Sequence, residues 1–166
     1  HSKILLNAAL ETGLPVWVGL SCCDSKFDNS VIGRNFRAEK EKSLIYDENK
    51  YKDQPKYLPE DKIILLEDII KSLTSLGGDV YGIMHTWFQD SIGGLKILKN
   101  NWKGPIMFYP EIHKFDTNTH KAIITMTEEE FSNSILELID DQIQIVGGCC
   151  GVNDKHLKRL IQSISE

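Results

Sequence analysis

The feature that most constrains the fold of this chain is a regular alternation of short apolar segments with helical ones. Four apolar, β-rich runs begin near residues 16, 79, 105 and 143, and segments with helical spacing of apolar residues lie between them. Such alternation predicts an α/β fold with a parallel sheet and right-handed crossovers. Two architectures fit this pattern: a small open doubly wound sheet, and one half of an eight-stranded (β/α)8 barrel.

The expected strands cover residues 16–20, 79–84, 105–109 and 142–146. The expected helices cover residues 2–12, 61–76, 91–100 and 127–140, and a last helix runs from about Asn153 to the end. The helix over 127–140 opens with Thr127 and Glu130 in the S/T-x-x-E capping pattern. Between about residues 24 and 60 the chain is polar and aperiodic, which predicts a solvated insertion that can act as a lid.

Composition excludes several classes of protein. Of the 166 residues, 41% are hydrophobic, which is typical of a folded chain and not of a disordered one. No apolar run approaches the ~18 residues needed to cross a bilayer, so we expect no membrane partner. A formal net charge of -5 with scattered lysines argues against nucleic acid as a partner. The four cysteines form two adjacent pairs, which predicts reduced thiols and a cytoplasmic location.

Side chains with metal-binding or thiol chemistry follow each expected strand. They are Cys22, Cys23 and Asp24 after the first strand, His85 after the second, residues 109–113 after the third, and Cys149 and Cys150 after the fourth. Because the carboxyl ends of parallel strands meet at one edge of a sheet, these side chains are expected on a single rim.

The Gly-Gly-Cys-Cys-Gly run at residues 147–151 is the most specific motif. Its glycines permit a sharp turn and a close approach of the backbone to a ligand, while the two thiols point toward the same binding centre. Zinc held by two thiolates and a third protein ligand keeps a fourth position open, which is typical of a catalytic site. We therefore predict Zn²⁺ as the cofactor, with His85, Cys149 and Cys150 as ligands. A substrate thiol in the open position would be deprotonated at neutral pH. Residues interpreted as packing, surface or helix positions instead are Cys22, Cys23, His113, His120 and His156.

The segment QIQIVGGCCGVNDKHLKRL resembles the C-terminal end of the zinc-dependent homocysteine S-methyltransferases. The segments ETGLPVWVGLSCCD, GGDVYGIMHT and GPIMFYPEIHKFD are similar to the fifth, sixth and seventh barrel strands of that family. The resemblance implies that residues 1–166 form one partial domain, the C-terminal half of a (β/α)8 TIM-type barrel, with a polar insertion at about 24–60. It also implies an activity, in which zinc binds homocysteine as a thiolate and a small-molecule methyl donor converts it to methionine.

The chain departs from the family pattern at several positions. The family holds zinc with three cysteines; Cys149 and Cys150 match two of them, whereas His85 replaces the third and Met84 replaces the asparagine before it. Glu111 stands where the family usually has asparagine. The first four strands of the family, with their Asp-Gly-Gly turn and Glu-Thr motif, have no counterpart here. We therefore expect an N-terminal half-barrel from the same or another chain.

Two other functions stay open at this point. One is a non-catalytic metal- or thiol-binding relative that has lost turnover, and the other is a metal-free α/β protein with redox-active cysteines. The methyl donor is also open, because S-adenosylmethionine, S-methylmethionine, betaine and a folate or cobalamin carrier all fit the pattern.

Overall fold

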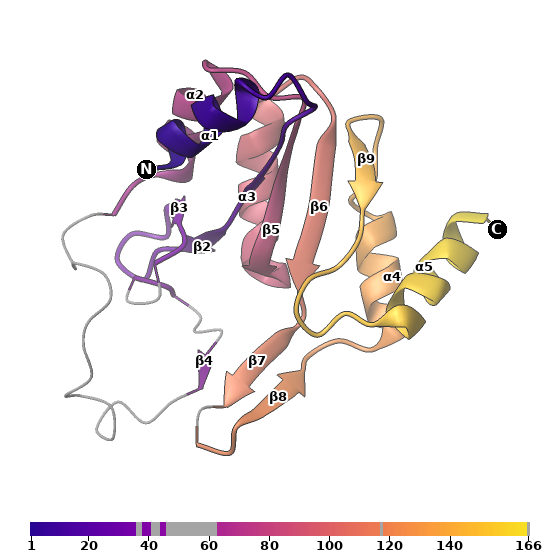
Figure 1. Cartoon of the computed structure of the whole chain (residues 1–166). Helices are drawn as coiled ribbons and strands as arrows, with labels where there is room; N and C mark the ends of the chain where they lie inside the picture. Colours follow the sequence, from indigo (N-terminus) through magenta and orange to yellow (C-terminus); the bar gives the residue numbers. More distant parts are fainter. Residues whose placement is uncertain (36–37, 41–43, 46–62, 117, 166) are drawn as a thin grey trace.

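The computed structural model describes residues 1–35, 38–40, 44–45, 63–116 and 118–165. Its centre is a four-stranded parallel sheet in the order β1-β5-β6-β9 (Figure 1). The strands are β1 (Trp17–Leu20), β5 (Val80–Trp87), β6 (Ile106–Glu111) and β9 (Ile143–Val146). The prediction of an α/β fold with four parallel strands is confirmed, and the four strands lie side by side in the order in which they occur in the chain.

The helices of the described residues are α1 (Ser2–Leu10), α2 (Leu66–Thr74), α3 (Phe88–Asn101), α4 (Glu128–Leu136) and α5 (Asp154–Ser165). The predicted capping box of α4 is present, because the Thr127 hydroxyl accepts a hydrogen bond from the Glu130 backbone N–H and the Glu130 carboxylate accepts one from the Thr127 backbone N–H. None of the described helices combines the length and the apolar character that crossing a membrane requires.

Three helix boundaries differ from the prediction by three residues or more, and one of them is the end of α4, which lies at Leu136 and not at residue 140. Helix α2 begins at Leu66 and not near residue 61, because Ile64 accepts a hydrogen bond from Gly33 and Leu65 forms a bridge with Ile32. Residues 61 and 62 lie outside the described residues. Helix α3 begins at Phe88, three residues earlier than predicted, because β5 runs on to Trp87 and passes into α3 without a loop.

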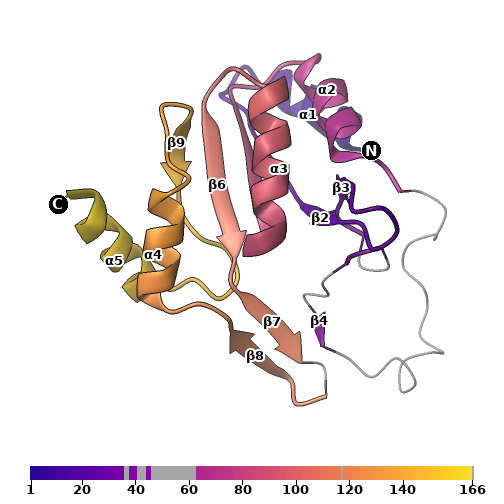
Figure 2. The same cartoon turned by 180° about the vertical axis from the view of Figure 1, so that it is seen from behind.

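The apolar core lies against the face of the sheet that α3 covers (Figure 2). Tyr81 and Ile83 of β5 are fully buried in one cluster with Leu95 and Leu98 of α3. Burial of apolar side chains is the main stabilising contribution to such a fold, at about 25 cal/mol per Å² removed from water. This packing fixes the strands beside one another, so that their carboxyl ends meet at one edge.

Two smaller β structures lie near the carboxyl edge of the sheet. Strands β2 (Cys22–Asp24) and β3 (Val31–Gly33) form an antiparallel hairpin directly after β1. Strand β7 (His113–Asp116) follows β6, and it pairs with β8 (Lys121–Ile124) on one side and with β4 (Leu44–Ile45) on the other (Figure 1).

The interpretation of residues 24–60 as a solvated insertion needs correction at its start. Ile32 is fully buried, and the side chains of Arg34 and Glu39 are only 8% and 3% exposed. The physical reason is the pairing of β3 with β2, which folds this part of the segment back against the edge of the sheet. Residues 46–60 lie outside the described residues, and a lid formed by them stays a prediction.

Asp90 in the first turn of α3 makes stability dependent on pH. Burial of the side chain, and then the negative charge of Asp24, raise the pKa of Asp90 to about 7. In the unfolded chain the pKa of an aspartate is about 3.9, so the folded state binds the proton more tightly. The contribution of this proton to stability is complete below about pH 4 and is lost as pH rises through about 7.

The substitution Asp90→Asn should remove this dependence, because an amide does not titrate. Between pH 5 and pH 8 the free energy of unfolding in urea should fall less in Asp90→Asn than in the wild type, by at least about 1 kcal/mol. Asp154→Asn is the matched control, because Lys158 lowers the pKa of the exposed Asp154 and this group titrates below that pH range. If the free energy of unfolding changed equally with pH in Asp90→Asn and in the wild type, the raised pKa of Asp90 would be contradicted.

Candidate metal centre

Backbone hydrogen bonds fix the loop after β9 beside the end of β6. The Gly147 N–H donates to the carbonyl oxygen of Phe108 at 3.1 Å, and the Cys149 N–H donates to that of Pro110 at 3.0 Å. In return, the Ile112 N–H donates to the carbonyl oxygen of Cys150 at 2.9 Å. The two cysteines are therefore held at the carboxyl edge of the sheet by the same kind of contacts that join its strands.

Two glycines of this loop stand where a side chain is excluded. A Cβ atom on Gly147 would lie 2.3 Å from the ring of Tyr109, and Gly151 has a φ of 90°, in the region that favours glycine. The Cys149 Sγ and Cys150 Sγ atoms are 3.7 Å apart, and both residues are half-buried. These contacts show close packing of the loop against Tyr109, and the predicted close approach of the backbone to a ligand stays a prediction.

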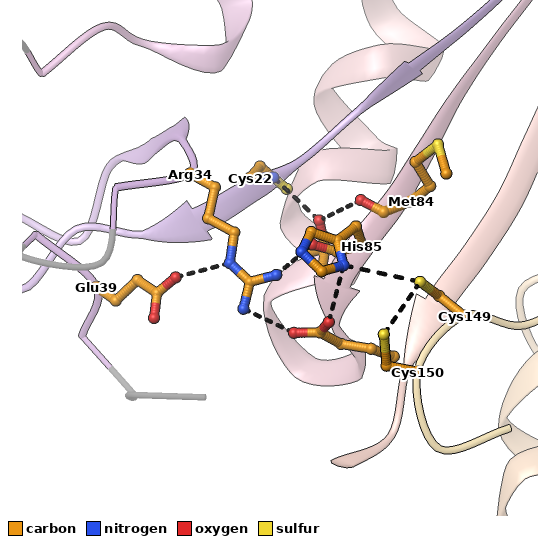
Figure 3. A network of polar contacts seen from close by, with 9 residues as sticks. Cys22, Arg34, Glu39, Met84, His85, Cys149 and Cys150 are labelled. Atoms are coloured by element: carbon orange, nitrogen blue, oxygen red, sulfur yellow. Dashed lines mark hydrogen bonds and ion pairs between the residues drawn. The ribbon is translucent and has the colours of Figure 1, made fainter. Parts of the chain in front are cut away.

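His85 reaches the same place from the end of β5. Its φ of 49° is left-handed, and the register between β5 and β6 shifts between Met84 and Trp87. Irregularities of this kind redirect side chains and are common beside functional sites. The His85 Nδ1 atom lies 3.8 Å from the Cys149 Sγ, and the three predicted ligand atoms lie within 4.8 Å of one another (Figure 3).

Two of the three separations between these atoms are close to those expected around a tetrahedral zinc ion, and the third is at most 4.8 Å. With Zn–S bonds of about 2.3 Å, two sulfur ligands at the tetrahedral angle lie about 3.8 Å apart, and a sulfur and a nitrogen ligand lie slightly closer. The observed separations are 3.7 Å between the two sulfurs and 3.8 Å between Cys149 Sγ and His85 Nδ1. The His85 side chain is 50% exposed, so one side of the cluster faces solvent.

A buried ion network adjoins the three side chains (Figure 3). The Arg34 guanidinium donates from Nε to the Glu39 carboxylate at 2.9 Å and from Nη2 to the Glu111 carboxylate at 2.7 Å. Its Nη1 donates to the backbone carbonyl oxygen of His85. The second Glu111 oxygen lies 3.4 Å from the His85 Nδ1. The sequence offered no signal for Arg34 or Glu39, and for Glu111 it offered only the departure from the family's asparagine.

A second group of possible ligands consists of Glu111, His113 and Cys150, whose ligand atoms also lie within 4.8 Å of one another. His113 lies on strand β7 and is half-buried, which corrects its interpretation as a surface or helix residue. Its Nδ1 atom is buried and has no hydrogen-bond partner among the described residues. Glu111 is engaged by Arg34 at 2.7 Å, so this group is less free to take a cation than the first.

Cys22 and Cys23 are packing residues, as predicted. Each is 1% exposed, and Cys22 belongs to the main core cluster. Burial raises the pKa of both thiols to about 12, so they are neutral at physiological pH. Among the described residues, neither belongs to a group of possible metal ligands. The thiols available for chemistry are therefore Cys149 and Cys150.

The parallel α/β sheet and the thiol–imidazole cluster at its carboxyl edge define a class of protein with a candidate site for a soft metal ion or a thiol compound. The family model for homocysteine S-methyltransferase matches residues 65–164, a range that contains His85, Cys149 and Cys150. This chain belongs to the homocysteine S-methyltransferase family. No curated protein matches the sequence.

Proposed function

We propose that His85, Cys149 and Cys150 bind one zinc ion and that the chain carries the zinc- and thiol-binding part of a homocysteine S-methyltransferase. The observation that carries this proposal is the approach of two sulfurs and one imidazole nitrogen, at 3.7 Å and 3.8 Å, in a member of this family. The substrate is homocysteine, the co-substrate is a small-molecule methyl donor, and the product is methionine.

The three proposed ligands bind zinc in different protonation states. Cys149 and Cys150 bind as thiolates, while His85 binds as a neutral imidazole through Nδ1, so the three ligands carry two negative charges. When bound, zinc supplies an open position at which a thiol loses its proton near neutral pH. The His85 side chain is 50% exposed, so a thiol can reach the cluster from solvent on this side. The homocysteine sulfur then forms a bond to the methyl carbon as the bond from the donor to that carbon breaks, and the donor leaves with the electron pair.

We further propose that residues 1–166 form one partial domain that another half completes as a (β/α)8 barrel. Trp17 on β1 and Met84 on β5 lie on the face of the sheet opposite the core and are 55% and 36% exposed. The helix that precedes β1 and the helix that follows β9 also carry exposed apolar residues, which are Ile4 and Leu5 in α1 and Ile161 and Ile164 in α5. A second half-barrel would cover this face and both edges, which proteins normally protect.

Methyl transfer to homocysteine is the direct test of this function. The zinc-loaded chain, together with a half-barrel from the same or another chain that completes it, should form methionine from homocysteine and one of a panel of donors, with methionine detected by mass spectrometry. Cys149→Ser in the same assembly should reduce the rate at least about 100-fold, since a lost metal ligand costs more than a lost outer partner. If the chain binds zinc but no donor yields methionine, the protein is a non-catalytic metal-binding relative. If the purified chain has free thiols and no metal, the alternative of a metal-free protein with redox-active cysteines is supported.

A further inference from the structure

Arg34 is a buried cation beside the candidate metal centre, and it lies outside the residues that the family model matches. It directly follows β3, and its backbone N–H donates to the carbonyl oxygen of Ser21 at 3.0 Å. Because Ser21 follows β1, this contact places Arg34 at the carboxyl edge of the central sheet. The segment at the start of the insertion therefore contributes a residue to the surroundings of the site.

The guanidinium group of Arg34 contacts two different parts of the centre. Nη1 donates to the backbone carbonyl oxygen of His85, and Nη2 donates to the Glu111 carboxylate. Nε is held by Glu39, only five residues away in the sequence, which fixes the orientation of the planar group (Figure 3). The side chains of Arg34, Glu39 and Glu111 are 8%, 3% and 2% exposed, so water does not compete strongly for these contacts.

His85 is the proposed ligand that most needs such support. A left-handed conformation is sparsely populated by residues other than glycine and persists only where the surroundings hold it. The Arg34 contact holds the peptide that follows this residue. Glu111 lies 3.4 Å from the same Nδ1 atom that is the proposed zinc ligand, so this contact is not a restraint on a zinc-bound ring.

We propose that Arg34 is a positioning residue of the metal centre, which holds the His85 backbone so that the imidazole faces the two cysteine sulfurs. This inference rests on the proposed zinc site. It assigns to the polar insertion a function at the centre. Arg34 also places one positive charge between the two buried carboxylates of Glu39 and Glu111.

The test compares zinc affinity and Co²⁺ spectra of Arg34→Met with those of the wild-type chain. Loss of an outer partner of a metal ligand lowers metal affinity about 10–100-fold, and we expect a loss in this range, measured by competition with a chromophoric chelator. The visible absorption of the Co²⁺-loaded variant should also change in band position, because the imidazole is displaced. A purely structural residue would lower the amount of folded protein but leave the spectrum of that fraction unchanged.

Arg159→Met is the matched control, because it removes an arginine of α5 that forms an ion pair with Glu129 of α4. Its affinity and spectrum should equal those of the wild type. Should Arg34→Met fail to fold, Arg34→Lys keeps the charge but not the planar fork, and it should still weaken zinc binding about tenfold or more. If the folded Arg34 variant has the zinc affinity and the Co²⁺ spectrum of the wild type, this inference is overturned and the proposed zinc site is not. If the wild-type chain itself binds no zinc, the proposed function is overturned.

Discussion

Serine in place of Cys149 should lower the zinc content of the purified chain from about one ion to almost none. A serine hydroxyl stays protonated at neutral pH and does not replace a thiolate as a zinc ligand, so only Cys150 and His85 remain. The affinity should fall by more than the 10–100-fold that loss of an outer partner costs. Cys150→Ser should have the same effect, since its sulfur lies 3.7 Å from that of Cys149. Metal analysis after gel filtration and chelator competition measure both quantities.

The control for these variants is Cys23→Ala, which removes a thiol of the other cysteine pair. Cys23 is 1% exposed and packs against Ile32 and Ala38, so this variant should lose some stability and retain its zinc. Urea unfolding of all three variants separates loss of metal from loss of fold. Zinc retained in full by Cys149→Ser would contradict the assignment and show that the metal lies elsewhere in the chain.

The second large effect concerns His85 and separates its role as a ligand from its backbone conformation. Asparagine tolerates a left-handed conformation, so His85→Asn should preserve the turn at a φ of 49° while removing the imidazole. We expect zinc affinity to fall at least about 100-fold. His85→Cys restores the residue type that this family usually has, and it should retain zinc with a third sulfur ligand, visible as stronger sulfur-to-metal absorption when Co²⁺ replaces zinc.

His120→Asn is the matched control, because His120 also has a positive φ, 55°, and lies in the turn between β7 and β8. This variant should bind zinc as the wild type does. The ligand assignment would be contradicted by wild-type affinity in His85→Asn, or by the same loss of affinity in His120→Asn.

Much of the fold is predictable from local patterns in the sequence. The four strands of the central sheet are apolar runs, and their parallel arrangement follows from the helices between them. The hairpin of β7 and β8 is not visible in the same way, since every residue of β8 is exposed and no alternation of buried and exposed positions marks it. Similarly, the start of α2 depends on contacts of Ile64 and Leu65 with β3, more than thirty residues earlier.

The candidate site is predictable only in part, for a related reason. His85, Cys149 and Cys150 are residue types with a chemistry of their own, and their positions after parallel strands predict that they meet. Arg34 looks like any polar residue of a surface segment. Its ion pair with Glu111 joins residues 77 positions apart, and no local pattern encodes such a contact. The residues that surround the ligands therefore become visible only in the folded structure.

X-ray absorption at the zinc edge of the loaded chain, before and after addition of homocysteine, tests the central claim most directly. The account predicts two sulfur neighbours at about 2.3 Å and at least one nitrogen at about 2.0–2.1 Å, with a third sulfur appearing when homocysteine is present. A chain that binds no zinc, a shell of oxygen and nitrogen alone, or a sulfur count that homocysteine does not change would contradict it.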